Sequence, residues 1–520
     1  MSQYTLGIDI GTTGLKAVAL DLDQLGQGIV AHVERPHTLL SPHPAWAEED
    51  ASQWWDTTVS ALRELLQSIP PSAIAAIGVS GMVPAMVLLD ERGQPLRRSI
   101  QQNDARAAAE VEELRASVDG AEFFRLTGGV PNQQNIAPRW RWLMRHEPEI
   151  VARAAHLVGS YDYITYRLSG SLSLEENWAA ESGLYDVGRH AWHTPYLSQA
   201  GIPAHLLPDV HPPTTIVGAV TSEAAAATGL REGTPVISGS ADHVAAALAA
   251  GLTANGDVLL KFGGAGDILY CAESPEPDPH FYFDYHDIPG LTLINGCMAS
   301  SGSLVKWFAR ELAASADLAQ LDREAAEIRP GSEGVIALPY FLGEKTPIFD
   351  PAARGVFAGI MLHHTRAHLY RAVLESVCYG FEHHLALLRD AGRPLTQVRV
   401  ADGGSRSPLW MQIAADVIGE PITVVGGEAA SALGVAFVAA IGAGRVHDWG
   451  DIQRYTPTSA TYTPRPGAHA IYQRGFTLYR DLYLRIEPTL HALGKLDTPD
   501  AADPELPNSG APSEIATALG

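Results

Sequence analysis

Three short segments combine glycine with hydroxyl or carboxylate side chains at the ends of β-prone stretches: residues 9–14, 263–266 and 402–405. Glycine lets the backbone approach a phosphate closely and point its N–H groups inward. Thr12 and Thr13 add hydroxyl donors, and Asp9 could hold a hydrated Mg²⁺. Any one of these turns could simply join two strands. Three of them, at corresponding places in two halves of the chain, favour a nucleotide ligand.

Other nucleotide and hydrolase motifs do not occur in the sequence. The chain has no G-x-x-x-x-G-K-[ST] segment, which disfavours a P-loop enzyme. No glycine fingerprint opens a βαβ unit with a suitable acidic residue beyond it, so dinucleotide binding is also disfavoured. No G-x-S-x-G turn is present, which leaves no case for an esterase.

The elements around the glycine turns alternate between strands and helices, which is typical of an α/β fold. In the first half the pattern predicts strands at residues 4–10, 15–23, 28–34 and 73–81 and helices at 51–68 and 105–118, the first of them capped by Asp50. The second half repeats strand, glycine turn and strand over residues 256–273, with helices at 304–314 and 366–388 and a strand, turn and helix over 398–410. We therefore predict two related α/β halves, divided near residues 245–255, with a ligand between them.

Composition limits the classes of protein to which this chain could belong. With 520 residues, 46% of them apolar and 18% charged, it is expected to form at least two globular domains. The net charge of −23 disfavours nucleic acid and membrane surfaces as partners. No apolar run reaches the roughly 18 residues of a membrane helix, and the first residues do not resemble a signal peptide. Three widely spaced cysteines suit reduced thiols, so a cytoplasmic location is expected.

Five ordered blocks of the sequence carry a resemblance to a known family. They are LGIDIGTTGLKAV, SIQQNDARAAAEVEEL, PVISGSADHVAAALAAG, the long segment from LPYFLGEKTP to LESVCYG, and VADGGSRSPLW with EAASALGVAFVAA after it. Over residues 4–485 the chain resembles the FGGY carbohydrate kinases, nearest to the xylulose kinases. The resemblance implies two actin-like (ribonuclease H-like) ATPase domains with a ligand cleft between them. It also implies an N-terminal domain at 1–248, a C-terminal domain at 249–485 and a mobile tail at 486–520.

The resemblance implies roles for particular residues. Asp242 matches the family's catalytic base, although an aspartate there could also cap the helix that follows. Asp9 would bind Mg²⁺ through water. The residues expected to contact ATP are Gly11, Thr12 and Thr13 at the first turn, Gly263, Gly264 and Gly266 at the second, and Gly403 and Gly404 beside the adenosine.

The sugar side departs from the xylulose kinase pattern. Val83 and Pro84 stand where a Met-His pair is usual, His243 replaces an asparagine after Asp242, and Gly264 replaces a threonine. Loss of polar groups puts the substrate in question, because hydroxyl recognition needs paired donors and acceptors. The substrate-binding candidates are Val83, Pro84, Asn103, Asp104, Gln134, Asp242 and His243, with Gln102 and Asn135 nearby. The amides and Asp104 could equally be structural.

The resemblance implies ATP-dependent phosphorylation of a small sugar, with ATP and Mg²⁺ as cofactors and D-xylulose, giving D-xylulose 5-phosphate, as the first expectation. The alternatives are another ketose, a polyol such as erythritol, or autoinducer-2. A non-catalytic nucleotide-dependent sensor on the same fold is a further alternative, which the presence of both Asp9 and Asp242 disfavours. We expect small-molecule sugar and ATP as partners, and a homodimer with a second copy of the chain is left open.

Overall fold

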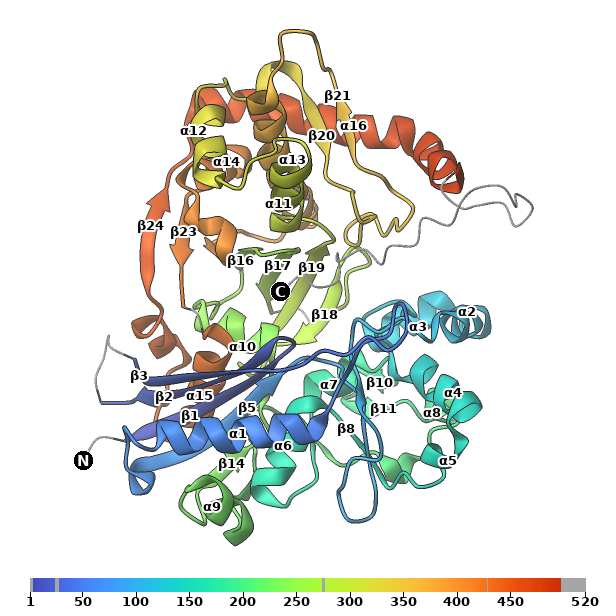
Figure 1. The fold of residues 1–520 in the computed structure, drawn as a ribbon, viewed down its shortest axis with the longest axis vertical. Coiled ribbons are helices and arrows are strands. Elements are labelled where there is room, and N and C mark those ends of the chain that lie inside the picture. Colours follow the sequence, from blue (N-terminus) through green and yellow to red (C-terminus); the bar gives the residue numbers. More distant parts are fainter. Residues whose placement is uncertain (1–2, 24–27, 274–275, 428, 497–520) are drawn as a thin grey trace. The chain divides into compact units, whose positions relative to one another are not determined.

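The computed structural model describes the chain except for residues 1–2, 24–27, 274–275, 428 and 497–520 (Figure 1). The chain forms two compact units, each assembled from separate segments. Unit 1 comprises Met1–Ala254, Cys271–Ile294 and Gly427–Pro457, and unit 2 comprises Asn255–Tyr270, Asn295–Gly426 and Thr458–Gly520. These two units, and the two seven-stranded sheets of the chain, agree with the two α/β halves expected from the sequence.

The centre of unit 1 is a seven-stranded mixed sheet in the order β13-β14-β5-β1-β2-β3, with β15 paired to β5. Strands β1 to β3 form an antiparallel meander, and β5 adds to β1 in parallel, as do β14 and β15 to β5. The strands span β1 Tyr4–Gly11, β2 Gly14–Asp21, β3 Ile29–Pro36, β5 Ile74–Gly81, β13 Ile216–Ala219, β14 Pro235–Ile237 and β15 Ser240–Ala241.

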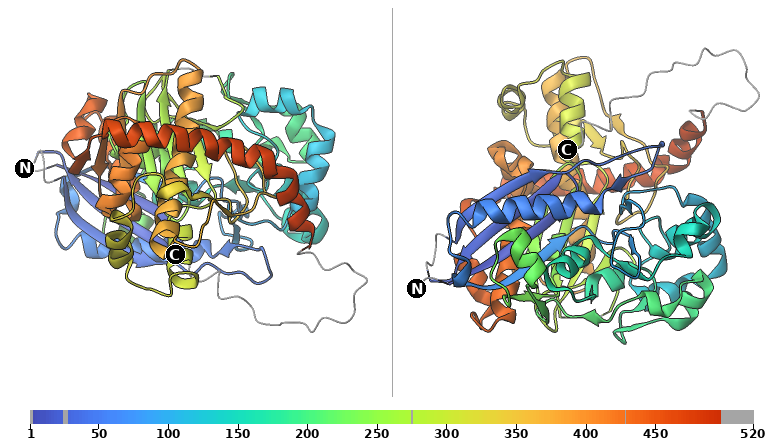
Figure 2. Two further views of the ribbon diagram at one scale, coloured as in Figure 1. Left: turned by 90° about the horizontal axis from the view of Figure 1, so that it is seen from above. Right: turned by 60° about the horizontal axis from the view of Figure 1, so that its bottom comes forward.

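Helices cover both faces of this sheet, as the right-hand view of Figure 2 shows for α1. Helix α1 (Ala51–Leu65) packs on β2 and β3, and its N-cap is Asp50, whose carboxylate accepts a hydrogen bond from the Ser52 backbone N–H. The predicted cap is thereby confirmed. Helices α10 (Asp242–Ala249) and α15 (Ala430–Gly442) pack on each other and contact the sheet. Their apolar residues form one buried cluster with those of β2 and β5.

Helix α15 approaches its neighbours so closely that glycine is required at the contact points. A Cβ added to Gly434 would lie 1.9 Å from the Ala245 carbonyl oxygen on α10. A Cβ on Gly7 of β1 would lie 1.8 Å from the Ala432 carbonyl oxygen. The backbone contact therefore fixes α10, and the residues at its start, against the sheet.

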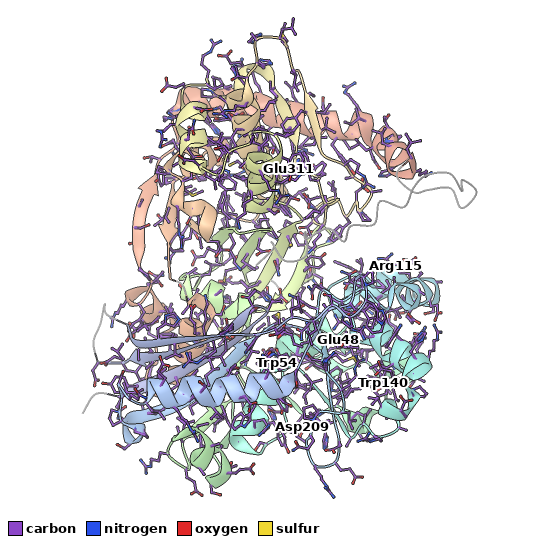
Figure 3. The ribbon with its side chains drawn as sticks, viewed as in Figure 1. Glu48, Trp54, Arg115, Trp140, Asp209 and Glu311 are labelled. Atoms are coloured by element: carbon purple, nitrogen blue, oxygen red, sulfur yellow. The ribbon has the colours of Figure 1, made fainter. Side chains whose placement is uncertain are left out.

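The rest of unit 1 is a set of short helices and paired strands beside the sheet. Trp140 of α4 (Ile136–His146) is fully buried there, as is Trp54 of α1 nearer the sheet, and the labels in Figure 3 mark both positions. The helices are α2 Ala108–Ser117, α3 Gly120–Thr127, α4 Ile136–His146, α5 Pro148–Val151, α6 Ser160–Ser169, α7 Glu176–Glu181, α8 Thr194–Ala200 and α9 Ser222–Thr228. The short strand pairs are β4 Glu48–Glu49 with β7 Ser99–Ile100, β6 Val87–Leu89 with β8 His156–Val158, β9 Leu174–Glu175 with β12 Val210–His211, and β10 Tyr185–Asp186 with β11 Ala191–Trp192.

The second sheet has the order β18-β19-β17-β16-β22-β23-β24. Its strands span β16 Asp257–Phe262, β17 Gly266–Ala272, β18 Tyr282–Tyr285, β19 Thr292–Met298, β22 Gln397–Ala401, β23 Ile422–Val425 and β24 Thr458–Tyr462, and the division between the units runs through β17 and β19. Strand β22 adds to β16 in parallel and β23 to β22, while β24 closes the edge antiparallel. The same arrangement, with β5 beside β1 and β14 beside β5, occurs in the first sheet. The two sheets therefore share a plan.

The helices of unit 2 gather around α13, which is buried along most of its length. Phe381 of α13 packs on Phe262 with ring centroids 4.5 Å apart, and Trp410 contacts the same ring at 5.0 Å. The helices span α11 Gly302–Glu311, α12 Leu318–Ala326, α13 Arg366–Asp390, α14 Pro408–Ile418 and α16 Pro466–Leu496, with a strand pair of β20 Ile336–Leu338 and β21 Val356–Ala358.

The tail expected at residues 486–520 begins within α16, which continues to Leu496. Residues 497–520 of that tail lie outside the described residues. Among the helices that the structure describes, none has the length and apolar composition needed to cross a membrane.

Candidate functional site

Parallel pairing brings the chemically active residues of unit 1 to one edge of its sheet. The register places Asp9 of β1 beside Ser80 of β5, and Ser80 beside Ser240 of β15. Because the carboxyl ends of parallel strands meet at the same edge, the turn after β1, the segment after β5 and the start of α10 are neighbours. This register was not derivable from spacing along the chain.

The first glycine turn joins β1 to β2. Asp9 accepts a hydrogen bond from the Ser80 hydroxyl at 2.9 Å, and the Thr12 hydroxyl lies 2.7 Å from the Met82 sulfur. Thr13 is exposed. A Cβ on Gly14 would lie 2.4 Å from a backbone oxygen of β3, so the turn requires glycine there. One carboxylate beside hydroxyls suits Mg²⁺, which keeps several of its waters when protein binds it.

Asp242 is the first residue of α10, and its side chain is about one-third exposed. Its Oδ1 accepts a hydrogen bond from the His243 backbone N–H at 2.6 Å. The N-cap position belongs to Ala241, so the alternative interpretation of Asp242 as a helix cap is wrong. A carboxylate in the first turn of a helix is favoured by the helix dipole and remains accessible to a ligand.

The ring of His243 lies among three carboxylates, two of which, Asp284 and Glu181, sequence reasoning missed. Its Nε2 is 3.1 Å from Asp284 Oδ2 on β18 and 4.0 Å from Glu181 Oε1 at the end of α7, and its Nδ1 is 3.4 Å from Asp242 Oδ1. The side-chain amide of Asn177 binds both backbone groups of Tyr285, which fixes Asp284 against α7. The only sequence signal was a carboxylate within the otherwise apolar and aromatic strand FYFDY.

The segment that replaces the Met-His pair is buried. Val83 and Pro84 are joined by a cis peptide bond, and both are inaccessible to solvent. The Pro84 carbonyl accepts a hydrogen bond from the Arg139 guanidinium at 2.8 Å, and Trp178 donates to the Ala85 carbonyl at 2.8 Å. These bonds hold the segment after β5 in a defined shape.

The remaining sugar-side candidates differ in accessibility. Asn103 is exposed, and Gln134 is half-buried with its amide 3.3 Å from that of Gln102. The carboxylate of Asp104 is buried: Arg106 binds both of its oxygens, and the Ala47 backbone N–H donates to Oδ2 at 2.6 Å. Asp104 therefore has a structural part in this loop, whereas Asn103 and Gln134 have polar groups that a ligand could reach.

In unit 2, the parallel pair β16 and β22 brings the second and third glycine turns together. A Cβ added to Gly263 would lie 3.1 Å from Asp402 Oδ2. Gly264 is exposed, and its carbonyl accepts a hydrogen bond from the Ser303 hydroxyl at 2.8 Å. Ser303 thus places a hydroxyl beside the position where threonine is usual.

The backbone of the third turn is strained. Asp402 has φ 72° and ψ −175°, a region that residues other than glycine rarely adopt. Gly403 and Gly404 follow in a short 3₁₀ helix, Gly403–Arg406, and Gly403 has open space where a side chain would be. A Cβ on Gly404 would lie 2.6 Å from the Trp410 ring, so that glycine is required for packing. Gly266 is likewise buried, with a Cβ position 2.6 Å from Met298.

Two clusters in the described part of the chain have potential metal ligands within 4.8 Å of one another: Glu181, His243 and Asp284 in unit 1, and Asp350, Glu487 and His491 in unit 2. In the second, Asp350 Oδ2 already binds the Tyr483 hydroxyl at 2.7 Å and His491 Nε2 at 2.9 Å. Asp350 therefore forms a hydrogen-bonded link between the loop before β21 and α16.

Comparison with known proteins gives the chain its family. Residues 4–249 match the N-terminal domain of the FGGY family of carbohydrate kinases, and residues 264–443 match the C-terminal domain. A xylulose kinase of Escherichia coli is 30% identical over 93% of this chain and 99% of its own length. An L-xylulose/3-keto-L-gulonate kinase of the same organism is 30% identical over 94% and 98%.

Solved structures agree with this assignment. The crystal structure of a xylulose kinase from Rhodospirillum rubrum has a TM-score of 0.89 and 45% identity, covering 94% of this chain and 100% of that one. A glycerol kinase of Plasmodium falciparum shares the fold, with a TM-score of 0.83 at 19% identity and coverage of 92% and 98%. The expected pair of actin-like α/β domains is confirmed. The chain belongs to the FGGY family of carbohydrate kinases and is a sugar kinase.

Proposed function

We propose that this enzyme transfers the γ-phosphoryl group of ATP to D-xylulose, giving D-xylulose 5-phosphate, with Asp242 as the base. The observation that supports it best is the position of Asp242: an accessible carboxylate at the same sheet edge as the Asp9 turn, with one oxygen held by a backbone N–H. The xylulose kinases among its relatives support the choice of sugar.

The proposed reaction needs alignment and charge neutralisation more than covalent help. The sugar hydroxyl oxygen bonds to the γ-phosphorus while the bond from that phosphorus to the β–γ bridging oxygen breaks, and ADP leaves. Asp242 orients the hydroxyl and accepts its proton late in the transfer. Mg²⁺ bound through water by Asp9 would neutralise charge on the phosphates. Gly11, Thr12 and Thr13 would donate to the transferred phosphoryl group.

The turns of unit 2 would bind the remainder of ATP. We assign Gly263, Gly264 and Gly266 to the phosphates, with the Ser303 hydroxyl holding that turn through its hydrogen bond to the Gly264 carbonyl. Gly403 and Gly404 would lie against the adenosine, because Gly403 leaves open space where a side chain would stand.

On the sugar side, Asn103 and Gln134 would replace the polar contacts that the buried Val83 and Pro84 cannot make. Asp104 would act indirectly, through its ion pair with Arg106, by holding the loop that carries Asn103. Because these sugar contacts differ from the xylulose kinase pattern, a second substrate is also proposed. The L-xylulose/3-keto-L-gulonate kinase, also 30% identical, favours L-xylulose or a 3-keto sugar acid as the alternative.

A coupled assay for ADP release over pentuloses, hexuloses, 3-keto-L-gulonate, polyols and autoinducer-2 tests the proposal. We expect the highest kcat/KM with D-xylulose. If another compound exceeds it tenfold, the substrate is wrong although the kinase assignment stands. Sugar-independent ADP release with every compound would contradict the proposed transfer itself.

A further inference from the structure

Four carboxyl groups from three parts of unit 1 surround the single imidazole of His243. Asp242 is its neighbour on α10, Asp284 comes from β18, and Glu181 ends α7. Asp287, just beyond β18, is buried and interacts with the same ring through its charge. Both ring nitrogens face carboxylates, so neither is directed at solvent.

We propose that His243 is a positioning residue for the base: a protonated imidazole, anchored by Asp284, that orients the Asp242 carboxylate and balances its charge. This inference rests on the proposed function and deepens it, since it assigns His243 to the base in place of direct sugar contact.

The distances place the His243 ring between the carboxylates of Asp284 and Asp242. His243 Nε2 lies 3.1 Å from Asp284 Oδ2, and Nδ1 lies 3.4 Å from Asp242 Oδ1, both within ion-pair distance. Asp284 is only 2% exposed, so its negative charge lacks water and stabilises a cation strongly. Oδ1 of Asp242 already accepts the His243 backbone N–H at 2.6 Å. Because Oδ1 is held by this backbone N–H and faces the ring, Oδ2 is the oxygen left for a substrate hydroxyl.

The acid–base properties of the cluster agree with this geometry. Burial alone would lower the pKa of His243, but the charge of Asp284 and hydrogen bonds with Asp242 and Asp284 raise it well above its usual value. Burial raises the pKa of Glu181 well above the usual range, and the neighbouring Asp284 raises it further. Burial also raises the pKa of Asp287 to about 7. These directions favour a proton on Glu181 and a cationic ring on His243.

A divalent cation on Glu181, His243 and Asp284 is the competing interpretation of the same cluster. It would require a deprotonated Nε2 and a charged Glu181, against the direction in which burial and the neighbouring charges act on both groups. A protonated His243 therefore accounts for the cluster better than a bound divalent cation, because it does not require a charged Glu181.

The first experiment does not depend on activity. Nuclear magnetic resonance of ¹⁵N-histidine in the whole protein, assigned with His243→Asn, should show both ring nitrogens of His243 protonated at pH 7.5. In Asp284→Asn, the pH at which the ring loses its proton should fall by at least one unit. A neutral ring at pH 7.5 in the wild type would overturn the proposal. So would one Zn²⁺ or Mn²⁺ per chain, retained after dialysis and lost in Asp284→Asn.

The second experiment measures kinetics against pH for His243→Asn, His243→Gln and Asp284→Asn. Removal of the cation should lower kcat at least tenfold, leave the KM for ATP within about twofold, and move the acid limb of kcat/KM upward by about one pH unit. His243→Gln should recover little of the kcat lost in His243→Asn, because glutamine reaches farther than asparagine but carries no charge. The matched control is His280→Asn, an exposed histidine 3.1 Å from Asp278, which should change nothing.

These results separate the two proposals. An unshifted pH profile with a lower kcat in all three variants would mean a merely structural role and contradict the positioning proposal. If the wild type shows no sugar-dependent ADP release, the proposed function fails, while the nuclear magnetic resonance result still decides whether His243 is the anchored cation.

Discussion

Replacing Asp242 by asparagine removes the proposed proton acceptor and leaves most of the local structure in place. The asparagine Oδ1 can still accept the His243 backbone N–H that Asp242 binds at 2.6 Å. The side chain is about one-third exposed and makes no cap hydrogen bond, so folding does not depend on its charge. The expected cost to stability is the loss of a favourable helix-dipole interaction, about 0.3–1 kcal/mol.

The expected effect on catalysis is much larger. A general base contributes about 10²–10⁴-fold, which corresponds to about 2.7–5.4 kcal/mol of transition-state stabilisation. We expect kcat to fall by that factor in Asp242→Asn. The Kd for ATP should stay within about twofold, because the glycine turns and the hydroxyls of Thr12 and Thr13 are unchanged.

The assay pairs turnover with nucleotide binding and thermal unfolding. Asp119→Asn serves as the control: Asp119 caps α3 in the same unit, and its carboxylate accepts the Glu122 backbone N–H at 2.9 Å. Aspartate and asparagine cap helices about equally well, so this variant should keep full turnover. If Asp242→Asn keeps more than about a third of wild-type kcat, Asp242 is not the base.

Three further predictions follow from the contacts described above. Asp9→Asn should raise the Mg²⁺ concentration needed for half-maximal rate at least tenfold, measured by titration at saturating ATP; an unchanged requirement would place the metal elsewhere. Burial raises the pKa of Glu49 to about 7, so the native state holds a proton that the unfolded state loses near pH 4.5, and stability falls as pH rises through that window. Urea unfolding should show Glu49→Gln more stable than wild type at pH 8, by up to about 3 kcal/mol, with no gain at pH 4.5. Gly434→Ala, whose Cβ would lie 1.9 Å from the Ala245 carbonyl oxygen, should lower stability by about 1–3 kcal/mol or more, whereas Gly467→Ala, with open space, should not.

Local patterns predicted the elements well, because each depends on residues close together in the chain. The apolar periodicity of residues 51–65 and the carboxylate of Asp50 define α1 without any tertiary information. The repeat of strand, glycine turn and strand likewise indicated two related halves, which the shared strand plan confirms.

Long-range packing could not be predicted from the sequence alone. Helix α15 lies late in the chain, yet it covers the first sheet, because its small residues allow backbone contact with β1 and α10. The burial of Asp104 and Glu110 is an example that the sequence pattern does not indicate. Asp104 forms an ion pair with Arg106, and Glu110 forms one with Arg145. The sequence pattern does not show that these side chains meet.

The carboxylates around His243 show the same limit at the site. Asp284 reaches the ring because Asn177 of α7 binds the backbone of Tyr285 through both ends of its amide. That link joins segments 108 residues apart, so no spacing rule could have found it. A histidine after the proposed base, Asp242, therefore looked like a change in sugar contact when only the sequence was considered.

In the proposed function each unit would supply a different part of the chemistry, because each places its loops at the carboxyl ends of its own parallel strands. In unit 1, β1, β5 and β15 end near Asp9, Met82 and Asp242, where carboxylates and a buried apolar turn predominate. In unit 2, β16 and β22 end in glycine turns with few side chains. Carboxylates suit a metal and a proton, whereas open backbone suits phosphate and a flat base. On this proposal, one strand plan used twice would yield an acid–base edge and a nucleotide edge, and the difference would lie in the residues that follow the strands.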